Sequence, residues 1–134
     1  MAICAPQLGQ KAALWGMENL SAWLADERGE ILARGGSMRA GFARLADWTL
    51  VGCGAYFAYV AHPFDAPSDR VARALVERAG ILTLPGTMFG PRADQGGSGR
   101  AERTLRVAYA NVDAAGIADL FRRLDDAAAS GLEA

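Results

Sequence analysis

The sequence predicts an α+β fold in which helices cover a small, mostly antiparallel sheet, with a long helix at the N-terminal end. Three observations support this prediction. Apolar residues recur at helical spacing from Gln7 onward, short aromatic and branched runs separated by glycine follow, and a helix-spaced segment closes the chain. The expected element order is helix, strand, strand, helix, strand, strand, helix. A chain of 134 residues has the length of one domain, residues 1–134.

The first expected element is one long amphipathic helix, or two helices in line, that begins at Gln7. Gly35-Gly36 costs roughly 1 kcal/mol per glycine relative to alanine, so a bend or break is expected there. Trp15 and Trp23 widen the apolar surface of the first half beyond what one small sheet would cover. This width predicts that the helix contacts something outside this chain.

Two strands and a helix are expected next. The runs 48–51 and 55–61 are rich in aromatic and branched residues, with Gly52-Cys53-Gly54 as the turn or bulge between them. The second run is apolar at odd and even positions alike, which predicts cover on both faces. Ser68 is the expected N-cap of a helix that ends before Gly80, and 81–84 forms a short strand.

The last third combines a loop, a strand and a helix. Residues 85–100 hold five glycines and two prolines, which indicates a long, partly mobile loop. Its segment 96–100 lacks the lysine of a phosphate-binding loop, so a plain surface loop is favoured. The strand 104–110 alternates, with Leu105, Val107 and Tyr109 on one side. Asp113 is the expected N-cap of the final helix.

Charge and cysteine content exclude several function classes. A formal charge of −1 gives no field that attracts nucleic acid or an anionic membrane, and no apolar run reaches the roughly 18 residues of a membrane span. Cys4 and Cys53 belong to no metal-binding cluster, so neither a metal site nor a disulfide is expected. We therefore expect a cytoplasmic protein with reduced thiols and with neither nucleic acid nor membrane as a partner.

Most single reactive side chains have a plainer explanation than catalysis. His62, the only histidine, has no nucleophile partner at a recognisable spacing and is expected to be a capping or surface residue. Cys53 is expected to be a small residue in a tight turn rather than a reactive thiol. Lys11, the only lysine, is expected on the polar side of the first helix. The aromatic residues of the second strand, Tyr56, Phe57 and Tyr59, are expected in the core or an interface.

Arg106 is the candidate binding residue. A guanidinium fixed on a strand is a rigid bidentate receptor for a carboxylate, and the small residues Ala108 and Ala110 leave room for a ligand. An internal salt bridge with Glu102 or Asp113 is the alternative on spacing alone.

Four segments carry a resemblance to a known family. Residues 5–10, followed by the long helix, are similar to the segment beyond the cofactor lysine of class I/II, fold-type I aminotransferases, which use pyridoxal phosphate. Gly54-Ala55-Tyr56-Phe57 resembles the family's G-[GA]-[FY]-F strand. Residues 78–90 resemble its AGV…PGxxFG stretch, and residues 104–110 resemble its xxLRlsfA strand. From Ile3 to about Asp125, the chain resembles the C-terminal small domain of these enzymes.

The resemblance implies a function for Arg106 and a larger parent enzyme. In the family, the arginine of the last motif binds the α-carboxylate of an amino acid whose amino group passes through pyridoxal 5'-phosphate to a 2-oxo acid. The implied substrates are therefore amino acids and 2-oxo acids, and the implied partners are the large domain and a second subunit in a homodimer. Lys11 falls after the family's lysine position, so no catalytic or cofactor-binding residue is expected here.

Two hypotheses follow for the whole chain. In the first, it is a fragment of a longer two-domain aminotransferase, with no cofactor and no activity in isolation. In the second, it is a free-standing α+β module that binds a small carboxylate ligand or a partner protein without catalysis.

Overall fold

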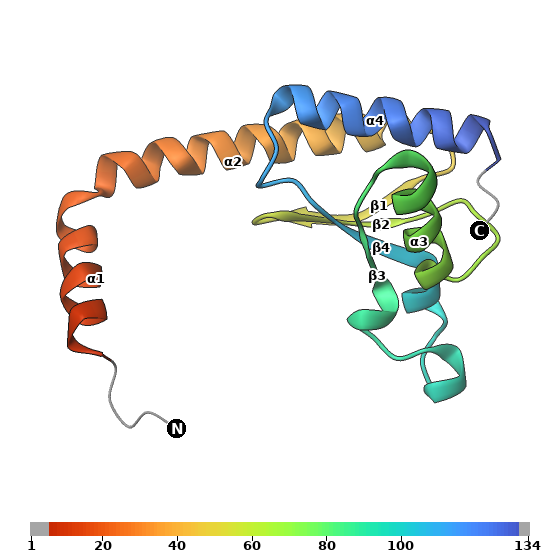
Figure 1. Ribbon diagram of the computed structural model, residues 1–134, viewed down its shortest axis with the longest axis horizontal. Coiled ribbons are helices and arrows are strands. Elements are labelled where there is room, and N and C mark those ends of the chain that lie inside the picture. Colours follow the sequence, from red (N-terminus) through yellow and green to blue (C-terminus); the bar gives the residue numbers. More distant parts are fainter. Residues whose placement is uncertain (1–5, 132–134) are drawn as a thin grey trace.

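The computed structural model describes residues 6–131, and Cys4 lies outside this range. The elements, in chain order, are helices α1 (Gln7–Asn19) and α2 (Ser21–Phe42), strands β1 (Thr49–Gly54) and β2 (Phe57–Ala61), helix α3 (Ser68–Ala79), strand β3 (Leu84–Pro85), the 3-10 turns η1 (Gly86–Met88), η2 (Ala93–Gln95) and η3 (Arg100–Arg103), strand β4 (Thr104–Ala108) and helix α4 (Ala114–Ala129). The α+β class predicted from the sequence is confirmed (Figure 1).

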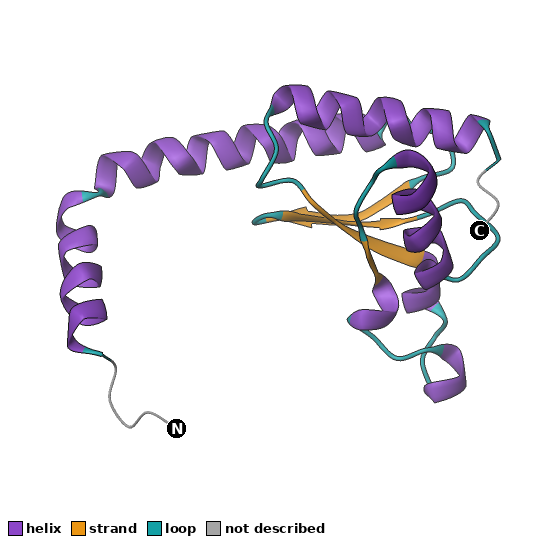
Figure 2. Cartoon of the chain, viewed as in Figure 1, coloured by secondary structure: helices purple, strands orange, loops and turns teal. Residues whose placement is uncertain are grey.

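The four strands form one antiparallel sheet in the order β1-β2-β4-β3. Helices α2, α3 and α4 pack on one face of it (Figure 2). The core lies between these layers, because alternate strand residues point toward the helices. Its largest fully buried side chains include Met38 of α2, Val60 of β2, Leu75 of α3, Leu105 of β4 and Leu124 of α4. The alternation predicted for strand 104–110 is confirmed by the burial of Leu105, Val107 and Tyr109.

The N-terminal part of the chain extends away from the sheet as an arm, formed by residues 7–30 of α1 and α2 (Figure 1). Helix α1 contains no buried residue, and the buried residues of α2 all lie at or beyond Gly35. Trp15 and Trp23 are 59% and 54% exposed. The expected broad apolar surface is therefore present, and residues 6–131 do not cover it.

The helix breaks at Leu20, and the break expected at Gly35-Gly36 does not occur. At Leu20 the backbone leaves helical geometry, with φ −107° and ψ 18°. Helix α2 instead runs through both glycines, because close packing at the buried Gly35 offsets the poor helix propensity of this pair. A Cβ at Gly35 would lie 3.3 Å from the hydroxyl of Tyr109, so glycine lets the helix pass close over that side chain.

The hairpin turns at Ala55-Tyr56, and not within Gly52-Cys53-Gly54, which belongs to β1. Between Leu50 and Gly52 the pairing register shifts, which places a bulge there. Ala55 takes the left-handed conformation, with φ 48°, although it is not a glycine. Tyr109 stabilises this turn twice, since its hydroxyl donates to the Ala55 carbonyl and its backbone N–H donates to the Tyr56 carbonyl, both at 3.0 Å.

Helix α3 ends as predicted but begins differently. Gly80 follows it in the left-handed conformation with φ 64°, as expected for a helix-terminating glycine. Ser68, however, is the first helical residue after Pro67, and its hydroxyl donates to the Ala101 carbonyl at 3.0 Å instead of capping the helix. The expected N-cap is therefore wrong, because a buried serine found a partner on another segment.

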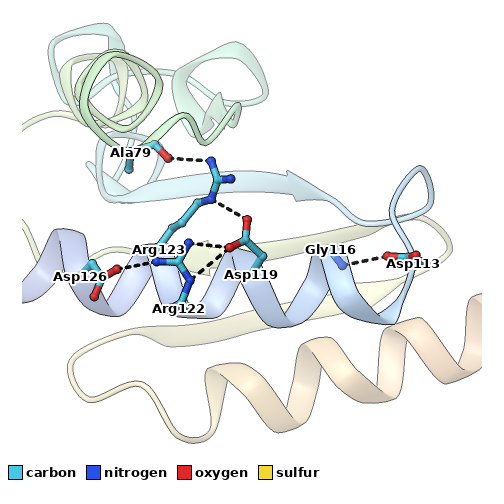
Figure 3. Close-up of polar contacts among 7 residues, drawn as sticks. All are labelled: Ala79, Asp113, Gly116, Asp119, Arg122, Arg123 and Asp126. Carbon is cyan, nitrogen blue, oxygen red and sulfur yellow. Dashed lines mark hydrogen bonds and ion pairs between the residues drawn. The ribbon is translucent and has the colours of Figure 1, made fainter.

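Helix α4 is fixed at its start and near its middle (Figure 3). The predicted cap is confirmed, because the Asp113 carboxylate accepts a hydrogen bond from the Gly116 N–H at 2.8 Å. Farther along, Arg123 donates to Asp119 at 2.6 Å and to the Ala79 carbonyl at 3.3 Å. The second bond satisfies a terminal carbonyl of α3 and connects the two helices.

Candidate functional site

The face of the sheet opposite the helices carries the candidate site. Ala58 and Val60 of β2 are buried, whereas Phe57 is exposed and Tyr59 is only half-buried. The expectation of cover on both faces of this strand is therefore wrong for residues 6–131. The expectation failed because it relied on composition, and aromatic residues occur on an open sheet face as well as in a core. Arg106 lies on this open face, directly opposite Tyr59 in the antiparallel register.

Two aromatic rings flank Arg106. Its guanidinium carbon lies over the Phe57 ring at 4.2 Å and over the Phe89 ring at 4.3 Å from the centroids. Neither ring offers the oxygen acceptors of a carboxylate, so these contacts hold the cation without giving its N–H donors a carboxylate partner. Phe57 was expected in a core or interface, and neither ring was predicted to contact Arg106.

No carboxylate pairs with Arg106 within the described part of the chain. Glu102 accepts a hydrogen bond from the Ala93 N–H at 3.4 Å, and Asp113 caps α4. The internal salt bridge that spacing allowed with either residue is therefore absent. The open position and the unpaired guanidinium suit a ligand that carries a carboxylate.

The loop that supplies Phe89 is ordered by close contacts with the sheet. Gly86 is buried, and a Cβ there would overlap the Thr104 hydroxyl and crowd the Tyr59 hydroxyl. These two hydroxyls are themselves hydrogen-bonded at 2.8 Å. Since Gly86 has no side chain, η1 can lie directly on the sheet. This close approach brings Phe89 to Arg106.

A second tie holds the same loop to α3. Arg92 donates to the Asp69 carboxylate at 2.8 Å, and this bond lowers the pKa of Asp69. Segment 85–100, expected to be a partly mobile loop, thus contains two 3-10 turns and an ion pair to a helix. Gly96, Gly97 and Gly99 lie in this loop between η2 and η3 and not at the start of an α-helix.

A cleft of about 490 Å³ lies between residues 80–84, the end of β4 and helix α4, and Arg106 is among the residues that line it. Its size is within the range of small-molecule sites. The lining includes Leu82, Leu84, Arg106, Asn111 and Leu120.

Lys11 lies in α1 and is exposed, as predicted. An amino group that bonds a cofactor needs a desolvated pocket or a charged neighbour that lowers its pKa. An exposed position in a helix without buried residues supplies no such pocket. Lys11, the only lysine of the sequence, is therefore not placed in a cofactor pocket formed by residues 6–131. These residues contain no group of three His, Cys, Asp or Glu side chains placed to hold a metal ion.

His62 is a correction to the sequence prediction. It is only 3% exposed, not at the surface, and its ring stacks on Phe64 with centroids 6.2 Å apart. Burial, followed by the positive charge of Arg103, lowers the pKa of His62 from its ordinary 6.5. Neither ring nitrogen of His62 has a hydrogen-bond partner within residues 6–131, so no hydrogen bond supports a role for His62 as a base.

The burial of His62 should make stability depend on pH. The folded-state pKa is below 6.5, so the unfolded chain binds more protons between that value and 6.5. Stability should therefore fall as the pH decreases below about 6.5, by about 1.4 kcal/mol for each unit that separates the two pKa values. Urea unfolding from pH 7.5 to 5.5 measures this. In His62→Gln, the only histidine is gone and the slope should disappear; an equal slope in both proteins would contradict the assignment.

Cys53 lies in β1, half-buried, with its Sγ 3.7 Å from the Tyr109 hydroxyl and 3.8 Å from the Gly35 carbonyl oxygen. Burial is the main cause that raises the pKa of Tyr109. Cys53 thus packs beneath α2, as a small residue, although in a strand and not in the turn that was expected.

Comparisons with known proteins add to this geometry. No family model and no curated protein matches the sequence. Solved structures do match. A PLP-dependent aminotransferase from Streptococcus suis 89-1591 superimposes with a TM-score of 0.75 at 14% identity, covering 96% of this chain and 32% of that one. N-Succinyldiaminopimelate aminotransferase from Mycobacterium tuberculosis gives a TM-score of 0.72 at 22% identity, covering 87% of this chain and 29% of that one.

A third structure agrees with these two. LysN, the alpha-aminoadipate aminotransferase from Thermus thermophilus, gives a TM-score of 0.69 at 26% identity over 87% of this chain and 29% of that one. The chain has the fold of an aminotransferase domain. It spans less than a third of the length of each of these enzymes.

The aminotransferase-domain fold agrees with the resemblance found in the sequence motifs. Arg106 of the last motif lies on the sheet face that the helices leave open. None of the helices formed by residues 6–131 is long and apolar enough to cross a membrane.

Proposed function

We propose that this chain is the substrate-clamping C-terminal domain of a PLP-dependent aminotransferase that moves an amino group between an amino acid and a 2-oxo acid. The observation that carries this proposal is the guanidinium of Arg106, held on the open face of an aminotransferase-domain fold with no carboxylate partner in the described residues. Shared fold alone would leave the function open, since one fold hosts many functions.

Arg106 binds the α-carboxylate of the substrate in this proposal. A guanidinium presents its donors in a rigid plane that matches the two oxygens of a carboxylate, which fixes orientation as well as position. Orientation matters because correct placement of the reacting bond contributes several kcal/mol to catalysis in favourable cases. The role of this domain is therefore to place the substrate, while other residues carry out the bond-breaking steps.

The remaining machinery belongs to parts outside this chain. The lysine that bonds pyridoxal 5'-phosphate, which supplies the electron sink for this chemistry, is assigned to a large domain and not to Lys11. The large domain and the second subunit of a homodimer are also the proposed cover of the exposed arm. The exposure of Trp15 and Trp23 supports this assignment, because apolar surface of this extent usually contacts a partner.

Activity assays test the proposal. The 134-residue chain, mixed with pyridoxal 5'-phosphate, should show no bound-cofactor absorbance and should transfer no amino group. A longer polypeptide, encoded by an open reading frame that continues upstream of Met1, should show the absorbance of bound cofactor and should transfer the amino group. Transamination by the short chain would contradict the domain assignment.

The non-catalytic alternative is separated by the same experiment. A free-standing module would have a genuine start codon at Met1, and neither the short chain nor any longer product would transfer an amino group. Carboxylate binding by the short chain would then remain its function.

A further inference from the structure

We propose that Phe57 and Phe89 are positioning residues that hold the Arg106 guanidinium in the orientation needed to receive a carboxylate. This inference rests on the proposed function, which makes Arg106 the carboxylate receptor. We call Phe57 and Phe89 the ring pair.

The ring pair contacts the guanidinium from two separate elements. Phe57 opens β2, and its centroid is 4.2 Å from the guanidinium carbon of Arg106. Phe89 follows η1, and the corresponding distance is 4.3 Å. The long side chain of Arg106 is therefore confined by contacts that do not depend on a salt bridge.

Such contacts suit a receptor better than a protein carboxylate would. A carboxylate partner would use the same N–H donors that the substrate requires. An aromatic ring instead attracts the cation through its π face and has no carboxylate oxygens to occupy those donors. The arginine then loses less conformational freedom when a ligand binds, because part of its side-chain entropy is already lost in the free protein.

Both rings are supported by their surroundings. Phe57 packs edge-to-face against Tyr56, with centroids 6.4 Å apart. Phe89 follows the turn that Gly86 allows to lie on the sheet, and its backbone N–H donates to the Gly86 carbonyl at 2.8 Å. The position of the ring pair is thus built into the turn of the hairpin and the start of the loop 86–103.

Substitution of either ring should leave the packing of the hydrophobic core unchanged. Both rings are at least a third exposed and neither belongs to the buried core. Met88, the neighbour of Phe89, is 64% exposed and carries no ring to place over Arg106, so Met88→Ala is a matched control in the same turn.

Side-chain NMR of the 134-residue chain tests the inference, with acetate as the carboxylate probe. The Arg106 Nε–H signal, assigned by its loss in Arg106→Lys, should lie upfield of other arginine signals because of the ring currents. Acetate should shift it. Phe57→Leu and Phe89→Leu should each move the signal back and weaken acetate binding roughly two- to tenfold, as expected for one side chain that must now be ordered on binding. Phe89→Tyr keeps an aromatic ring, so it should retain both the upfield position of the signal and the wild-type affinity for acetate. Met88→Ala should change neither.

The outcomes separate the inference from the proposed function. If wild type binds acetate through Arg106 but the leucine variants bind it equally well, the ring pair has no positioning role and the proposed function stands. If acetate leaves the Arg106 signal of the wild type unchanged, Arg106 is not the carboxylate receptor and the inference fails with the proposed function. The same conclusion follows if acetate binds to Arg106→Lys and Arg106→Ala as tightly as to the wild type.

Discussion

Replacing Arg106 with alanine in the proposed full-length aminotransferase should lower kcat/KM for its proposed amino-acid substrate by roughly 100-fold. Two charge-assisted hydrogen bonds to one carboxylate would be lost, and the cost is about 3 kcal/mol after the exchange with water. KM should rise because the substrate is held less tightly. The rate at saturation should fall as well, because a carboxylate without its receptor no longer orients the reacting bond. Steady-state kinetics on the purified variant measures both effects.

Two comparisons make this prediction specific. With an amine that lacks the carboxylate, the variant and the wild type should react at similar rates, because Arg106 has no group to bind. Arg100→Ala, which removes an exposed arginine of η3, should leave the kinetics unchanged. Arg106→Lys should recover only part of the loss, because an ammonium keeps the charge but not the planar fork. Unaltered kinetics in Arg106→Ala would remove Arg106 from the binding site.

Gly41→Ala should lower the free energy of unfolding by about 1–3 kcal/mol, the usual cost of overpacking. A Cβ at Gly41 would overlap the ring of Phe121 in α4, where α2 and α4 contact each other. That ring already packs edge-to-face on Phe42, with centroids 5.0 Å apart, so a shift that makes room for the Cβ would disturb this contact. Urea unfolding at pH 7.5 measures the change.

Gly36→Ala is the matched control on the same helix. Nothing lies within 4 Å of a Cβ at Gly36, so alanine should stabilise the chain by about 0.5–1 kcal/mol through its better helix propensity. Opposite signs at two glycines on one helix would show that packing and not propensity sets the effect at Gly41. Equal stabilisation by both substitutions would contradict the close contact between α2 and α4.

Features that depend on a few neighbouring residues were predictable from the sequence. Gly80 ends α3 in the left-handed conformation, and Asp113 caps α4, because each needs only backbone groups within one helical turn. The alternation of Leu105, Val107 and Tyr109 predicted the buried face of β4 for a similar reason, since successive side chains of a strand point to opposite faces.

Features that depend on distant contacts were predicted wrongly or missed. Gly35 was expected to break the helix, but it lies over Tyr109, which is far along the chain, and the close approach keeps the helix continuous. The hairpin turn was placed at Gly52-Cys53-Gly54, whereas hydrogen bonds from Tyr109 stabilise it at Ala55-Tyr56. Ser68 bonds the Ala101 carbonyl and not its own helix, a choice that local spacing does not reveal.

The candidate site divides in the same way. The type, spacing and strand position of Arg106, together with the ordered motifs around it, were sufficient to select it from the sequence alone. Its environment was not predictable, because the contact with Phe57 depends on the register between β2 and β4, and the contact with Phe89 depends on Gly86 fitting against the sheet. Local sequence therefore specified the candidate side chain and the face of the sheet that carries it. Long-range packing specified which rings orient that side chain, since register and close approach arise only when distant segments meet.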